Sequence, residues 1–70
     1  MIREADIVHE NEGHWVWRDT RRGYHAMKHK GTHSETDSTY RLDDDGKSLA
    51  IARVDYLAKR FPLDRRVDSQ

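Results

Sequence analysis

The sequence contains no cysteine, only one proline, and no long apolar run. Without cysteine the chain forms neither a disulfide nor a thiolate zinc site, which is typical of proteins in a reducing cytoplasm. No stretch approaches the roughly 18 consecutive apolar residues of a membrane span. Charged residues also interrupt the first residues before the apolar region of a signal peptide could form. We therefore expect a cytoplasmic protein that does not enter a membrane.

An excess of charge of one sign is also missing, because 13 basic residues balance 13 acidic ones. The charge is nevertheless arranged in blocks: residues 1–19 and 34–45 are net acidic, whereas residues 20–33 and 46–70 are net basic. Nucleic-acid binding depends on neutralising phosphates and usually shows as a basic domain. The neutral balance therefore counts against it, while alternating blocks suit pairing within the fold or between chains.

The length of 70 residues corresponds to one domain. We expect residues 1–62 to form a single small α+β domain and residues 63–70 to fray as a tail. A core of this size contributes only about 3–5 kcal/mol, so small domains often gain stability from metals or association. The short length therefore favours a homodimer or a contact with another protein.

Residues 47–61 show the apolar spacing of an amphipathic helix, with the apolar positions inside an arc of about 120°. The acidic run 43–45 precedes the segment, where it can cap free N–H groups, and Pro62 ends it. Asp55 and Lys59 have the spacing of a favourable i,i+4 ion pair. The predicted core stripe consists of Ala50, Ile51, Val54, Leu57, Ala58 and Phe61.

Alternating and aromatic segments upstream predict strands at residues 5–10, 13–19, 24–30 and 32–36. Turns are expected at 19–23 and near Gly31, and the polar segment 37–46 is interpreted as a connection. The predicted fold is α+β: a small antiparallel meander of three to four strands packed against one C-terminal helix. Trp15 and Trp17 share one face of their strand, and we expect them to cover the helix stripe.

The stretch YHAMKHKGTH places His25, His29 and His33 four residues apart. On a helix this spacing would hold one metal ion. On a strand it separates His25 from His29 by roughly 13 Å, given the rise per residue. His29 and His33 could meet across the turn, with His14 as a third candidate, but solvated surface histidines are the favoured interpretation. The sequence predicts no metal site.

No constellation indicates catalysis. The motif DDDGKS lacks the remaining ligands of a calcium loop and the upstream glycine of a phosphate-binding loop. Serines, histidines and aspartates are present without a local signature of nucleophilic catalysis. We predict that the chain is not an enzyme and has no cofactor.

Two surfaces remain as candidates for binding. The first is a helical patch apart from the core stripe, with spacing typical of partner-facing helices. It consists of Leu49, Ala52, Arg53, Tyr56 and Arg60. The second is a basic, aromatic hairpin that could contact nucleic acid. Its cations are Arg18, Arg21, Arg22, Lys28 and Lys30.

Two resemblances accompany these patterns. The order of three strands and a helix resembles the arm-type DNA-binding domain at the N-terminus of tyrosine integrases, although those domains are basic. The segments WVWRD, KGTHSETDS and AIARVDYLAKR, within residues 13–60, resemble small uncharacterised accessory proteins of phages and prophages. That second resemblance implies a phage accessory protein that binds a host component. The favoured function is non-catalytic protein–protein contact, with nucleic-acid binding as the alternative.

Overall fold

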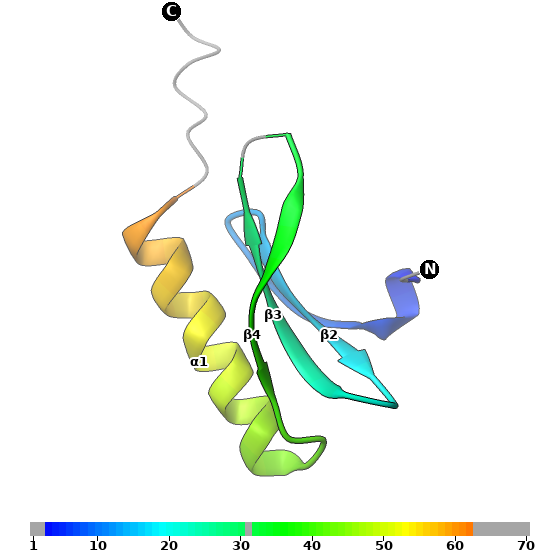
Figure 1. Ribbon diagram of the computed structural model, residues 1–70. Coiled ribbons are helices and arrows are strands. Elements are labelled where there is room, and N and C mark those ends of the chain that lie inside the picture. Colours follow the sequence, from blue (N-terminus) through cyan, green and yellow to red (C-terminus); the bar gives the residue numbers. More distant parts are fainter. Residues whose placement is uncertain (1–2, 31, 63–70) are drawn as a thin grey trace, which may run out of the picture.

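The computed structural model describes residues 3–30 and 32–62. The described chain is a four-stranded antiparallel meander followed by one C-terminal helix, an α+β fold (Figure 1). A short 3₁₀ helix, η1 (Glu4–Asp6), precedes the sheet. The strands are β1 (Ile7–Asn11), β2 (His14–Asp19), β3 (Gly23–His29) and β4 (Ser34–Tyr40), and the helix is α1 (Asp44–Arg60). The predicted tail 63–70 lies outside the described residues.

Strand β4 is longer than the sequence indicated. Residues 37–40 belong to it, whereas the sequence analysis interpreted 37–46 as a connection. The segment SETDSTY contains few apolar residues because β4 is an edge strand of the sheet and neither face of it is deeply buried. Hydrophobic alternation, the usual sign of a half-buried strand, is therefore absent from it.

Helix α1 begins at Asp44, three residues before the predicted start at 47, so only Asp43 of the acidic run 43–45 precedes it. Asp43 is its N-cap, and the Asp43 carboxylate accepts a hydrogen bond from the Gly46 N–H at 2.7 Å. Gly46 is buried against the preceding turn, and a Cβ built there would lie 1.8 Å from the Arg41 carbonyl oxygen. Only glycine therefore allows the first turn of α1 to approach Arg41 this closely.

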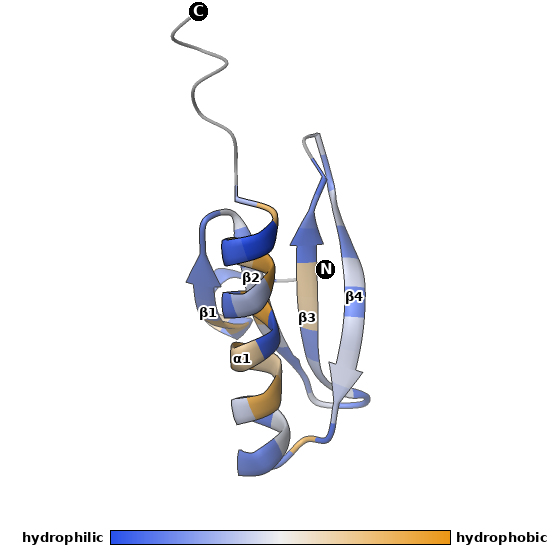
Figure 2. Cartoon of the chain, turned by 90° about the vertical axis from the view of Figure 1, so that its left-hand side faces the viewer, coloured by the Kyte–Doolittle hydropathy of each residue, from blue (hydrophilic) through white to orange (hydrophobic). Residues whose placement is uncertain are grey.

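Helix α1 covers one face of the sheet, mainly over β2 and β3 (Figure 2). Between them Val16 and Ala26, which are cross-strand partners, pack against Ala50 and Val54. All four are fully buried. These small and β-branched side chains let the helix lie close to the strands. We refer to this side of the sheet as the covered face.

The expectation that Trp15 and Trp17 cover the helix is wrong. Val16 lies beneath α1, and because side chains alternate along a strand, both tryptophans point to the opposite side of the sheet. There they are half-buried beside Met27 and His25, their partners on β3. We refer to this side as the open face, because α1 does not cover it.

Phe61 is a second correction, since it is 45% exposed rather than part of the core stripe. The helix ends at Arg60, and the Phe61 backbone leaves the helical conformation. Its ring instead lies beneath the Lys28 ammonium, with 3.8 Å from Nζ to the ring centroid. The other five predicted core positions of the helix are buried or half-buried.

Candidate functional site

The side of α1 that faces away from the sheet carries three exposed apolar or small residues. Leu49 is 57% exposed, Tyr56 is 50% exposed, and Ala52 between them is exposed as well. They lie three and four residues apart, so they form one line along the helix. We refer to Leu49, Ala52 and Tyr56 as the outer stripe.

Arg53 borders the outer stripe and is held within the chain. Its Nε and Nη2 donate to the two carboxylate oxygens of Asp37 on β4, at 2.6 and 3.2 Å. This contact holds the pKa of Asp37 below its ordinary value and raises that of Arg53. The guanidinium also lies 5.0 Å from the Tyr56 ring centroid. Arg53, predicted as a partner-binding residue, therefore anchors α1 to β4 and supports Tyr56.

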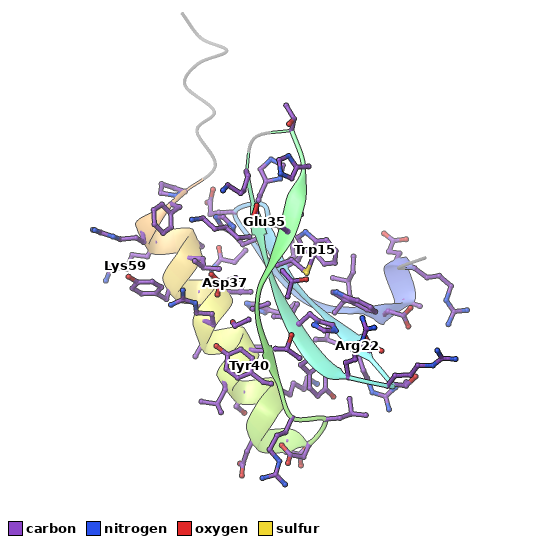
Figure 3. The ribbon with its side chains drawn as sticks, in the orientation of Figure 1. Trp15, Arg22, Glu35, Asp37, Tyr40 and Lys59 are labelled. Carbon is purple, nitrogen blue, oxygen red and sulfur yellow. The ribbon has the colours of Figure 1, made fainter. Side chains whose placement is uncertain are left out.

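A β-bulge explains why Asp37 reaches the helix. Ser38 pairs with Ala26 and Thr36 pairs with Met27, so Asp37 is the extra residue of β4 at that point. Its side chain lies on the helix side of the strand, between β4 and α1 (Figure 3).

Asp55 lies on the other flank of the outer stripe, and its carboxylate is also hydrogen-bonded within the chain. Its Oδ1 accepts hydrogen bonds from Asn11 Nδ2 at 2.9 Å and His9 Nε2 at 2.8 Å, both on β1. Both hydrogen bonds lower the pKa of Asp55, and the bond from Asn11 has the larger effect. The predicted Asp55–Lys59 ion pair does not form, because Asp55 turns toward the sheet.

The C-terminal end of the outer stripe is hollowed. Tyr56, Lys59 and Arg60 line this surface hollow, which combines an aromatic ring with two cations. Lys59 projects from the end of α1, away from the sheet (Figure 3). Among the described residues, no ion pair engages Lys59 or Arg60. The hollow therefore suits a group with both an apolar part and a carboxylate.

The five cations of the alternative nucleic-acid surface do not come together. Arg18, Arg21 and Arg22 lie at the β2–β3 turn, where β2 ends and β3 begins. Lys28 and Lys30 lie at the far end of β3, and the two ends are separated by about 20 Å of strand. Figure 3 shows Arg22 at one end of the sheet and Glu35, which pairs with Lys30 at 3.5 Å, toward the other.

His14 joins the helix end to the sheet. It is 1% exposed, its Nε2 donates to the Phe61 carbonyl at 2.6 Å, and its Nδ1 accepts from the His29 backbone N–H at 3.0 Å. Helix C-termini leave carbonyl groups without intrahelical partners, and His14 satisfies one of them. His14 therefore has both ring nitrogens engaged and none left for a metal ion.

His25 organises the open face. Its Nε2 lies 2.9 Å from Asp19 Oδ2, and its Nδ1 lies 2.7 Å from Thr39 Oγ1. Trp17 lies over the imidazole, with ring centroids 4.8 Å apart. Hydrogen bonding from His25, then from the Arg21 N–H, lowers the pKa of Asp19. The sequence analysis missed this network, whose only sequence signal is that Asp19 and His25 lie on either side of the three-residue β2–β3 turn, residues 20–22.

His29 and His33, which the sequence suggested could meet across the turn, each have another neighbour on β4. His29 pairs with Ser34 across the β3–β4 hairpin, and His33 lies 3.9 Å from Glu35. Within residues 3–30 and 32–62 no group of three histidine, aspartate or glutamate side chains could hold a metal ion. In the same residues no helix has both the length and the apolar character needed to span a membrane.

The described structure thus defines a small α+β domain whose helix presents an exposed outer stripe. Comparison with protein-family models, with curated proteins and with solved structures gives no match.

Proposed function

We propose that this domain is a non-catalytic binding protein that contacts another protein chain through the outer stripe of α1. The observation that carries the proposal is the exposure of Leu49 and Tyr56 on the side of α1 opposite its buried face. A helix that presents apolar side chains at i, i+3 and i+7 binds partners by laying that line into a groove or against a second helix.

The surroundings of the stripe support this proposal. Arg53 and Asp55, the charged residues on its two flanks, are engaged by Asp37, His9 and Asn11. Both charged groups thus have partners within the chain, so burial of the stripe would not leave a charge without a hydrogen-bonding partner. The Arg53 guanidinium over Tyr56 also fixes the ring in place, which reduces the entropy lost on binding.

The direct test is Tyr56→Arg, which replaces the aromatic ring of the stripe with a cation at an exposed position, outside the core. We expect this variant to lose association in size-exclusion chromatography with light scattering, and to lose partners in a pull-down. Thr20→Arg adds the same charge in the exposed β2–β3 turn and serves as the matched control. Unchanged mass and unchanged partners in the Tyr56→Arg protein would refute the proposal.

Nucleic-acid binding remains the alternative, and the separation of its five cations gives it less support. A titration of labelled DNA at about 50 mM salt tests it, since phosphate contacts strengthen steeply at low salt. Binding that Arg21→Ala and Arg22→Ala weaken, and Tyr56→Arg does not, would favour this alternative.

A further inference from the structure

We infer that the partner of the outer stripe is a second copy of this chain, packed antiparallel along α1. This inference rests on the proposed function and specifies the occupant of the same surface. It follows from how charge is distributed along the stripe.

The stripe is acidic at one end and basic at the other. Asp45 lies one turn before Leu49 on the same line of the helix, and Lys59 and Arg60 lie one turn after Tyr56. Asp45 is exposed, and no ion pair among the described residues engages it. With the flanking Arg53 and Asp55 satisfied internally, these end groups are the charges left to meet a partner.

A two-fold axis near Ala52 makes this distribution self-complementary. In an antiparallel pair, Asp45 of one copy lies opposite Arg60 of the other, and Leu49 lies opposite Tyr56, each contact occurring twice as an isologous interface requires. A parallel pair would instead place acid against acid and base against base. Charge therefore selects the antiparallel arrangement.

The shapes agree with this arrangement. Ala52 at the centre has only a methyl group, so two helices can approach to the short end of the usual 8–10 Å separation. At each end the hollow lined by Tyr56, Lys59 and Arg60 faces Leu49 and Asp45 of the second copy. That hollow suits an apolar group beside a carboxylate, and those two residues, one turn apart, supply both.

The test is a charge exchange across the pair, measured on the full chain by sedimentation equilibrium from about 10 μM to 1 mM at low salt, a range that covers weak dimers. We expect the wild type to form a dimer that salt weakens. Asp45→Lys alone, and Lys59→Glu/Arg60→Glu alone, should each weaken self-association by about tenfold or more, because like charges then face each other. An equimolar mixture of the two variants should recover a dimer, since every facing pair is again opposite in charge.

Asp44→Lys is the matched control, because it changes charge in the same helical turn but off the line of the stripe. It should leave self-association unchanged, and circular dichroism should show that all variants keep the fold. Failure of the mixture to recover association would overturn the antiparallel arrangement.

Two further outcomes separate the inference from the proposed function. A wild type that stays monomeric to 1 mM, while Tyr56→Arg abolishes capture of a different protein, would overturn the second-copy inference and leave the proposed function standing. A dimer that Tyr56→Arg does not weaken would overturn the second-copy inference, and an unchanged set of captured partners in the same variant would overturn the proposed function as well.

Discussion

The covered face and the open face of the sheet are stabilised mainly by different interactions. The covered face is apolar, with Val16 and Ala26 fully buried against Ala50 and Val54. The open face is ordered by hydrogen bonds around His25, with Trp17 stacked over its ring. Hydrophobic burial therefore fixes the centre of the helix on one side, with polar contacts only at its edges, and a polar network fixes strand neighbours on the other.

The largest change in the free energy of unfolding should come from truncating a side chain on the buried side of α1. Leu57 is 1% exposed, and Leu57→Ala should lower the free energy of unfolding by about 2–5 kcal/mol through lost burial and a cavity. Leu49→Ala, on the outer stripe of the same helix, should change it by no more than about 0.5 kcal/mol. Urea denaturation followed by circular dichroism measures both. Similar losses for the two variants would contradict the assignment of the covered face.

Gly46 allows a test of close approach at the edge of the covered face. Alanine favours helices over glycine by about 1 kcal/mol, so propensity alone predicts that Gly46→Ala stabilises. The steric conflict with the Arg41 carbonyl should reverse the sign, with a loss of about 1–3 kcal/mol. Ser48→Ala, at an exposed position of the same helix, is the control and should be neutral or slightly stabilising. Stabilisation by Gly46→Ala would show that the first turn of α1 has room for a methyl group beside the Arg41 carbonyl.

The open face should respond to loss of its hydrogen bonds. His25→Leu removes the donor to Asp19 and the partner of Thr39, and should cost about 1–2 kcal/mol. Thr39→Val removes only the hydroxyl contact and should cost less, about 1 kcal/mol. Thermal unfolding monitored by tryptophan fluorescence checks both. Equal stability of the wild type and His25→Leu would mean that neither these hydrogen bonds nor the Trp17–His25 ring contact contributes, and that strand pairing holds this face.

Acid should destabilise the protein through its bonded carboxylates. The pKa values of Asp19, Asp37 and Asp55 are all lowered in the fold, from an ordinary value of 3.8, by hydrogen bonds to the charged form. Their stabilisation is thus complete above the unfolded-state pKa, about 3.9, and is lost as pH falls from there through the folded pKa values. The free energy of unfolding should therefore fall with pH below about 4.

The same titration distinguishes the two faces. Asp37→Asn removes the acid response of the β4–α1 link, and His25→Leu reduces that of Asp19 on the open face. Each variant should show a shallower loss of stability below about pH 4 than the wild type. Guanidinium denaturation at pH 2.5 to 5 measures the slopes. An unchanged slope in both variants would mean that other groups govern acid unfolding.

The sequence predicted the helix well because its boundaries and its period are local properties. Acids mark its N-terminus, although Asp44 and Asp45 lie in its first turn and not before it, so the predicted start was three residues late. Pro62 follows its end, and apolar residues recur at helical spacing, so the outer stripe could also be found before the fold was known. Leu49, Ala52 and Tyr56 are exposed as that reading required, whereas Arg53 is engaged by a residue 16 positions away, which no local pattern reveals.

The sheet was harder to predict because both sides of β2 contain large side chains. Trp15 and Trp17 carry the most apolar surface, yet Ala50 and Val54 of the helix pack on the small side chains Val16 and Ala26 at the centre of the covered face, with Tyr24 beside them. Close packing depends on the fit of side-chain volumes across the interface, which hydrophobicity along one strand does not reveal. Strand β4 was partly missed because an edge strand needs no apolar alternation.

The bulge at Asp37 makes the pairing of β4 with β3 independent of the link between β4 and α1. Removing this one residue would leave Thr36 and Ser38 adjacent, opposite Met27 and Ala26, as an unbroken ladder. The number of residues in β4 is therefore not dictated by its pairing with β3. Chains of this fold one residue shorter at that point could keep the whole sheet and lose only the tether that aligns the helix and its outer stripe.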